Sequence, residues 1–449
     1  MKRKLWIAVL PALFYIGMTA YISQGIPSEA TKFFKSLATH YAPSGLAIKG
    51  TVLENNLFRS KIAIEISGTT AKINEKMKKL YRWPLRLEYT MKHGPLLLGD
   101  GIKLGVMEVE GEASFQELFS EEFLASVQMK KENQIDSYGM LTFFQDLCMK
   151  IETKGFIYSD LLNRREIEVS QLSGMIDMNL KSKKSMGTLR VDALKLRSGR
   201  YAETSLGFEK LEMDINILNL LEKSIYLGKM HLSAKAVEWM AKKHETDLSF
   251  RMSADIDIYE TTQQAFNMLY LLEVDDIRGK LSARSLSVPL ADTRLKWMAY
   301  IDGLSLESLS QWESYTPELL LSKNATLGST LILDKRGKEA LRLALALGYT
   351  GKMMKKSLNR LDRASKSNFL NHILGTASMH VKERFLDNLN AEYGFKNKQG
   401  VAFSMGMMLS KTLMTKTKEA YHIQMDYSPD IFILNERDIS KMLSSFNPI

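Results

Sequence analysis

The sequence predicts an α+β protein dominated by extended antiparallel β-sheet, with one N-terminal transmembrane helix and a helical C-terminal part. Three observations predict this class. An uncharged stretch, Leu5–Ser23, opens the chain directly after three basic residues. From about residue 46 to 350, apolar and polar residues alternate strictly in many segments, which is typical of antiparallel strands with one dry and one wet face. Apolar residues return to helical spacing near the C-terminus, and no alternating strand–helix rhythm appears.

The N-terminal stretch Leu5–Ser23 has the length of a membrane span. A helix of this length reaches roughly 28 Å at about 1.5 Å per residue, close to a hydrocarbon core of about 30 Å. Lys2, Arg3 and Lys4 precede it, so the positive-inside bias places residues 1–4 in the cytoplasm and exports the rest. We interpret 5–23 as the signal anchor of a single-pass bacterial inner-membrane protein with a periplasmic body. Cleavage near Gly25 and a buried soluble helix remain the alternatives.

Composition limits the classes of function. The chain has 449 residues and one cysteine, Cys148, which excludes an intramolecular disulfide, a CxxC redox motif and a cysteine-rich zinc site. The net charge of +10 permits attraction to anionic lipids, lipopolysaccharide or cell-wall polymers, although lysines spread over solvent faces are the favoured explanation. No basic motif interleaved with aromatic residues appears, so we expect no nucleic-acid binding.

The region 28–145 is predicted to be a small α+β region. Residues Glu29–Tyr41 place apolar side chains at helical spacing. Leu46–Leu53 and Lys61–Ser67 then predict a hairpin, and Leu85–Met91 and Lys103–Ala113 predict further strands.

The region 146–350 is predicted to be antiparallel sheet. The alternating segments are Ile176–Leu180, Leu211–Ile217, Leu248–Ile258, Leu295–Ile301, and a hairpin of Leu327–Leu333 with Leu341–Leu347. Their dry faces must be covered by a second sheet, by helices or by an apolar ligand. Whether the dry faces of Leu248–Ile258 and Leu295–Ile301 meet or line a groove depends on the tertiary structure.

Helices are predicted at five places within and after this sheet. They are Thr261–Glu273, Leu304–Trp312 (a shorter helix or a turn), Lys382–Tyr393, Val401–Thr415 and Asp438–Phe446. A last strand pair, Tyr421–Tyr427 with Ile431–Leu434, completes a third region, 351–449, of α+β character.

Short motifs resemble those of one bacterial family. The basic-apolar start, Asn56-Leu57-Phe58-Arg59-Ser60 before a strand, and His93-Gly94-Pro95-Leu96 between strands resemble the YdgA-like family, an inner-membrane-anchored envelope family of unknown function. Near the C-terminus, Leu434-Asn435 is followed by Glu436 where that family usually has glycine, which puts a tight turn there in question. The resemblance implies an anchored periplasmic protein and brings no catalytic residues.

No constellation of catalytic, cofactor-binding or metal-binding residues is found, so we predict none of these sites. His93 lies in a Gly-Pro turn, where a structural role competes with a ligand or proton-transfer role. His244 fits a solvated turn, His380 and Glu383 are too few ligands for zinc, and Asp255 and Asp257 fall on a wet strand face. Gly99–Gly101 is an ordinary turn.

We therefore expect a non-enzymatic, inner-membrane-anchored periplasmic protein that acts as an envelope interaction scaffold. Its partners would be the inner membrane and either envelope proteins or anionic lipids. The alternative is binding or transfer of a lipid or amphiphile along the apolar sheet face, and a hydrolase that uses His93 is the minor alternative.

Overall fold

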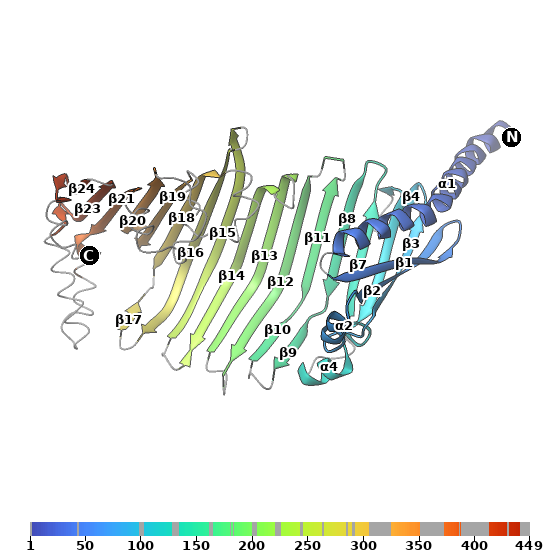
Figure 1. The fold of residues 1–449 in the computed structure, drawn as a ribbon, viewed down its shortest axis with the longest axis horizontal. Helices are drawn as coiled ribbons and strands as arrows, with labels where there is room; N and C mark the ends of the chain where they lie inside the picture. Colours follow the sequence, from blue (N-terminus) through green and yellow to red (C-terminus); the bar gives the residue numbers. More distant parts are fainter. Residues whose placement is uncertain are drawn as a thin grey trace. The chain divides into compact units, whose positions relative to one another are not determined.

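A computed structural model shows the chain as two compact units, Met1–Asn216 and Ile217–Ile449 (Figure 1). Each unit contains antiparallel sheet and is considered by itself. The structure describes residues 2–42, 45–97, 103–127, 134–160, 165–179, 181–182, 184–199, 204–220, 226–242, 246–262, 265–283, 286–289, 292–304, 325–350, 372–385, 387, 413–428 and 431–440. The three-region division expected from the sequence stays a prediction.

Unit 1 contains a sheet whose strands follow the order of the chain. Each strand in the following series pairs antiparallel with the next: β1 (Leu46–Asn55), β2 (Arg59–Gly68), β3 (Leu85–His93), β6 (Met107–Ser114), β7 (Gln134–Leu141), β8 (Asp146–Thr153), β11 (Leu172–Asn179) and β12 (Ser185–Ser198). The second half of β12 pairs with β10 (Arg165–Val169), which pairs with β9 (Phe156–Asp160). The predicted hairpin between residues 46 and 67 and the strand from Leu85 are present.

A long helix, α1 (Lys2–Tyr41), covers the first strands of this sheet on one face (Figure 1). Its Ile26 and Phe34 are buried against Ile62 of β2 and Met91 of β3. Gly50 of β1 allows this close approach, since a Cβ built there would lie 1.9 Å from the Phe34 ring. The predicted helix Glu29–Tyr41 is therefore the second half of a longer one.

The predicted transmembrane helix is the main correction. In the part of the chain that the structure describes, no helix combines the length and the apolar character that a membrane crossing requires. Residues at the end of the expected span pack against protein instead: Thr19 has no exposed surface and Ser23 is buried. This finding contradicts the anchor 5–23 in the predicted fold class and the single-pass inner-membrane localisation inferred from it.

Short elements complete unit 1. They are α2 (Ala71–Lys78), α3 (Phe115–Leu118), α4 (Glu121–Val127) and a separate pair of two-residue strands, β4 (Leu96–Leu97) and β5 (Lys103–Leu104). Ser114 and Glu117 form a capping box at α3. Phe115 of α3 is buried and contacts the ring of Phe156 on β9 at 5.7 Å. The boundary of the two units falls within β13 (Thr204–Leu220).

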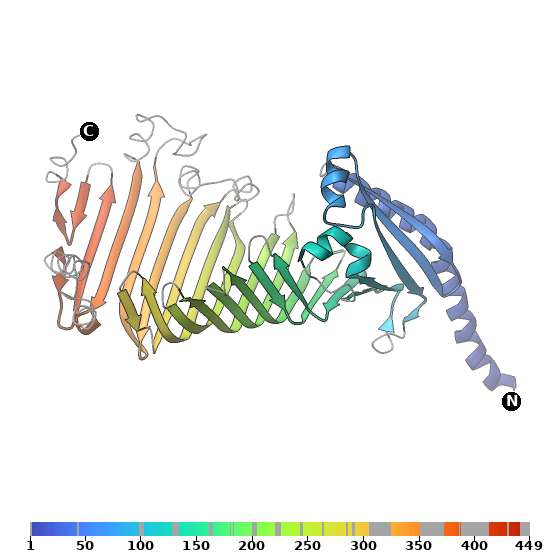
Figure 2. The ribbon, with the colours of Figure 1, turned by 90° about the horizontal axis from the view of Figure 1, so that it is seen from below.

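Unit 2 contains a meander of antiparallel strands (Figure 2). Consecutive members pair in the following order: β14 (Tyr226–Ala241), β15 (Thr246–Thr262), β16 (Ala265–Ala283), β18 (Thr293–Leu304), β19 (Thr326–Lys335), β20 (Lys338–Tyr349), β21 (Ile373–Lys382), β23 (Ala420–Ser428), β24 (Ile431–Leu434) and β25 (Arg437–Asp438). Two side strands, β17 (Leu286–Pro289) and β22 (Thr415–Lys416), pair with β16 and β23. The predicted hairpin has Leu327 opposite Leu347 and Leu333 opposite Leu341.

The predicted helix Thr261–Glu273 is wrong, because residues 265–273 belong to β16. Apolar residues occur here at both helical and alternating spacing, and short windows do not separate the two. Hydrogen bonding to β15 on one side and β18 on the other decides for strand. Leu304, expected to start a helix, is the last residue of β18, and residues 305–312 lie outside the described residues.

The prediction of a helical C-terminal part is also wrong, because most of its described residues lie in strands. Lys382 ends β21, and the described helical positions that follow are 383–385 and 387. Thr415 begins β22 and Asp438 ends β25, whereas 388–412 and 441–449 lie outside the described residues. The predicted pair Tyr421–Tyr427 and Ile431–Leu434 is present as β23 and β24.

The turn after Leu434 forms without glycine. Asn435 and Glu436 both have positive φ, 48° and 67°, and they connect β24 to β25. The Asn435 amide oxygen accepts from the Gln424 backbone N–H, and its Nδ2 donates to the Leu413 carbonyl. These bonds hold the left-handed conformation in which asparagine is tolerated better than most residues.

Candidate apolar binding site

The strand register of unit 2 collects apolar side chains on one face of the sheet. Leu272 lies opposite Trp297, Trp297 opposite Leu331, and Leu331 opposite Leu343. The residues that share this face are Met230, Leu232 and Ala234 on β14; Met252, Ala254, Ile256 and Ile258 on β15; Met268, Tyr270, Leu272 and Val274 on β16; Leu295, Trp297, Ala299 and Ile301 on β18; Leu327, Ser329, Leu331 and Leu333 on β19; Leu341, Leu343, Leu345 and Leu347 on β20; Ala377, Met379 and Val381 on β21; and Tyr421, Ile423, Met425 and Tyr427 on β23. We call this set the apolar face; Ser329 alone in it lacks an apolar or aromatic side chain.

The sequence left open whether the dry faces of Leu248–Ile258 and Leu295–Ile301 meet each other. In the structure they do not. They belong to β15 and β18, which flank β16 in the same sheet. Their apolar side chains therefore point from the same side of one sheet. Among the described residues, neither a helix nor a second sheet covers the centre of this side, where Trp297 is 39% and Leu345 is 45% exposed.

The margins of the apolar face are packed, and its centre is open. At one margin Phe266, Met268, Leu304 and Ala325 are buried together. At the other margin Val381 and its neighbours form a second buried cluster.

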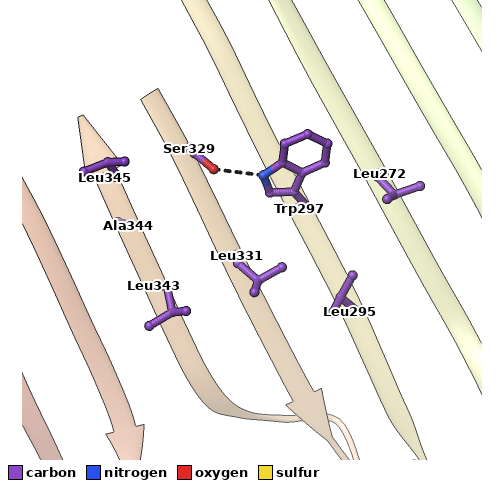
Figure 3. A pocket seen from close by; sticks show the side chains of 8 residues that line it. All are labelled: Leu272, Leu295, Trp297, Ser329, Leu331, Leu343, Ala344 and Leu345. Carbon is purple, nitrogen blue, oxygen red and sulfur yellow. Dashed lines mark hydrogen bonds between the residues drawn. The ribbon is translucent and has the colours of Figure 1, made fainter. Parts of the chain in front are cut away.

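An open depression of about 510 Å³ lies at the centre (Figure 3). Its lining is Leu272, Leu295, Trp297, Ser329, Leu331, Leu343, Ala344 and Leu345. Trp297 Nε1 donates a hydrogen bond of 2.8 Å to Ser329 Oγ. The indole N–H is thus satisfied, and apart from the serine hydroxyl the surrounding side chains are hydrocarbon.

The opposite face of unit 2 carries the charges. Arg294 and Lys296 both contact Glu273, at 2.7 and 3.1 Å. The Arg294 guanidinium, followed by Lys296, holds the pKa of the Glu273 carboxyl below its usual range, although burial acts in the other direction. The sheet is therefore amphipathic, with ion pairs on one side and the depression on the other.

Three residues that the sequence offered as site candidates also lie on this charged face: Asp255, Asp257 and His380. Asp255 contacts His231 Nδ1 at 2.7 Å, and Asp257 contacts Lys229 at 3.3 Å. His380 contacts Glu339 at 3.2 Å. Glu383 lies instead at the margin of the apolar face, where it contacts Lys416 and accepts from the Tyr421 hydroxyl. In the described part of the chain no three His, Cys, Asp or Glu side chains gather as a metal site would require. His244 and Gly99–Gly101 lie outside the described residues.

His93 occupies a different place, in unit 1 beneath α1. It is 3% exposed, and its Nε2 lies 3.0 Å from Ser60 Oγ, which has no exposed surface. Ser60 Oγ donates to Asn55 Oδ1 at 2.6 Å, whereas in a catalytic triad the serine hydroxyl donates to the histidine and a carboxylate bonds the other ring nitrogen. The sequence showed His93 as a turn residue and gave no signal for its pairing with Ser60, which lies 33 positions earlier.

Sequence reasoning also missed the Trp297–Ser329 pair, because the two residues are 32 positions apart. The alternation predicted the apolar faces of both strands, but only the register places Ser329 within reach of the indole.

Comparison with known proteins gives one family. Residues 1–285 match the model of a bacterial protein family of unknown function, DUF945. No curated protein and no solved structure matches the chain. Because the match covers more than half of the 449 residues, the chain belongs to the bacterial family DUF945.

Proposed function

We propose that unit 2 binds the acyl chain of a lipid or similar amphiphile in the depression at the centre of the apolar face, without catalysing a reaction. The observation that carries this proposal is the Trp297–Ser329 hydrogen bond within an otherwise hydrocarbon lining. A lining whose single polar side-chain pair is already joined by this bond favours a ligand segment of hydrocarbon.

The extent of the apolar face favours a bound partner. Eight strands about 4.8 Å apart and four residue rows about 6.8 Å apart give a projected area on the order of 700 Å². Part of this area belongs to the packed margins, and the open centre that remains is of the order of the few hundred Å² at which exposed apolar patches mark binding sites. Covering such a patch is favourable by about 25 cal/mol per Å² of apolar surface removed from water.

The size of the depression favours a small ligand at its centre over a protein partner. Its volume of about 510 Å³ lies within the roughly 300–1,000 Å³ of small-molecule sites. A protein interface would add a polar rim with direct hydrogen bonds. The interaction scaffold expected from the sequence remains the competing proposal.

The absence of catalysis is part of the proposal. The Ser60–His93 pair is the best catalytic candidate among the described residues, but Ser60 is enclosed beneath α1. A serine nucleophile needs access to its substrate, so we assign this pair to holding the structure together.

The narrower YdgA-like resemblance also stays a proposal. Its two motifs support it by their proximity, because Ser60 of the first contacts His93 of the second. The His93 backbone N–H also donates to the Phe58 carbonyl.

The test is direct binding of a fluorescent fatty acid to the full chain after removal of co-purified lipid. Leu331→Lys places a charge in the depression, and we expect affinity to fall at least tenfold. Thr330→Lys is the matched control, since Thr330 is the neighbouring residue on the opposite face; its affinity should stay within twofold of the wild type. Absence of saturable binding, or equal loss in both variants, overturns the proposal.

A further inference from the structure

We propose that His93 makes the docking of α1 onto unit 1 sensitive to pH, so that its protonation releases the helix and uncovers apolar sheet. The inference rests on a chain of buried hydrogen bonds and is independent of ligand binding by unit 2.

The chain of bonds connects α1 to the sheet through one hairpin. Ser23 Oγ on α1 donates to the Asn56 carbonyl at 3.0 Å, and Asn55 Nδ2 donates back to the Ser23 carbonyl at 3.1 Å. Asn55 Oδ1 accepts from Ser60 Oγ, which in turn contacts His93 Nε2. His93 is thus the inner end of the network that fixes α1.

The bond directions assign a neutral tautomer to His93. The single hydroxyl proton of Ser60 is given to Asn55 Oδ1 at 2.6 Å. The hydrogen bond at 3.0 Å must then run from His93 Nε2–H to Ser60 Oγ. The other ring nitrogen, Nδ1, carries no proton and makes no hydrogen bond in the described structure.

Among the side chains that the structure describes, no acid faces the ring to compensate a positive charge. On α1, residues 15–28 contain no charged side chain, and the phenol of Tyr15 lies near Gly94. Alternation turns Arg59 and Lys92 to the other face of the sheet, and Glu108 of β6 pairs opposite Lys92 on that same other face. The groups around the ring are the side chains of Asn55, Ser60 and Met107, together with the backbone carbonyls of Leu57 and Arg59.

The pKa of His93 agrees with this geometry. Burial lowers it from the usual value, and the carbonyls of Arg59 and Leu57 act more weakly in the opposite direction. Because the pKa of His93 is lower in the docked state than in the released state, its contribution to docking is fully present at pH values above the pKa of a free histidine, about 6.5. As pH falls below that value the released state takes up the proton first, so docking weakens about tenfold per pH unit until the docked pKa is reached.

Release would uncover a defined surface. Ile26 and Phe34 of α1 cover Ile62 and Met91, with Val109 packed beside them. Mildly acidic conditions would therefore expose an apolar patch on β2, β3 and β6 that α1 covers at neutral pH.

Hydrogen exchange of the full chain, corrected for the intrinsic effect of pH, tests the proposal. Between pH 7.5 and 5.0 we expect peptides from residues 15–34 and from β1–β3 to lose protection progressively below pH 6.5, by at most about tenfold per pH unit for a single proton. Peptides from β18–β20 should keep theirs. His93→Gln should remove the pH response, and His231→Gln, which alters an exposed histidine of unit 2, should retain it.

Two results overturn the proposal. One is hydrogen-exchange protection of α1 in the wild-type chain that stays constant down to pH 5.0. This result overturns the proposal even if His93→Gln does not fold. The other is a folded His93→Gln variant with the wild-type pH response. Ser60→Ala offers a further check, because it keeps the histidine and should keep the pH dependence at lower overall protection.

Discussion

Trp297 Nε1 donates to Ser329 Oγ at 2.8 Å across two neighbouring strands of unit 2. It is the hydrogen bond drawn between two lining side chains of the depression in Figure 3. It links the indole on β18 to Ser329 on β19, whose small side chain leaves room in the depression that both residues line.

The first prediction concerns that room. Ser329→Leu fills the depression, so we expect affinity for a fluorescent fatty acid to fall at least tenfold while the circular dichroism spectrum is unchanged. Thr330→Leu adds similar bulk on the opposite face and should leave affinity within twofold. Equal affinities of the two variants would show that the ligand lies elsewhere.

The second prediction uses two glycines with different surroundings. A Cβ at Gly50 would meet the Phe34 ring at 1.9 Å, whereas one at Gly25 within α1 would meet nothing within 4 Å. Gly50→Ala should therefore lower the free energy of unfolding of unit 1 by about 1–3 kcal/mol through overpacking. Gly25→Ala should raise it by up to about 1 kcal/mol through helix propensity. Urea titrations of both variants measure the difference, and a stabilised Gly50→Ala would contradict the packing of α1.

The third prediction concerns the turn at Asn435 and Glu436. Glu436 has φ of 67°, which costs a non-glycine residue about 1–2 kcal/mol. Glu436→Gly should raise the free energy of unfolding by about 0.5–1 kcal/mol, once the backbone entropy that the glycine loses on folding is subtracted. Asn435→Ala should lower it by about 1–2 kcal/mol, because two hydrogen bonds are lost. Calorimetry that finds the opposite order would argue against this turn.

The fourth prediction is a pH dependence on the charged face of unit 2. The pKa of Glu273 is lowered by Arg294 and Lys296, so its contribution is present above the unfolded pKa of about 4.3 and is lost as pH falls through the lower folded value. Glu273→Gln should cost about 0.5–1 kcal/mol at pH 7. The difference between mutant and wild type should shrink in urea titrations as pH falls below about 4. A difference that grows on acidification would contradict the assigned direction.

Local patterns predicted much of the sheet. Leu327–Leu333 and Leu341–Leu347 alternate, and the short polar loop between them sets the register that the structure shows. The hairpin of β1 and β2 and the strand pair near the C-terminus were predicted for the same reason. The segment Thr261–Glu273 was mispredicted because its apolar residues satisfy two periods, and only the strands on both sides of β16 exclude the helix.

The amino-acid sequence by itself determined many of the strands and which side of each of these is apolar, because side-chain direction alternates with every residue. The tertiary structure alone decided that α1 packs on β1–β3, which overturned the expected span, and that Ser60 meets His93 beneath it. It also decided that apolar sides of eight strands face the same way and leave a depression at Ser329. These features join residues more than thirty positions apart, and their distances follow from register summed over several strand pairs, which no local pattern contains.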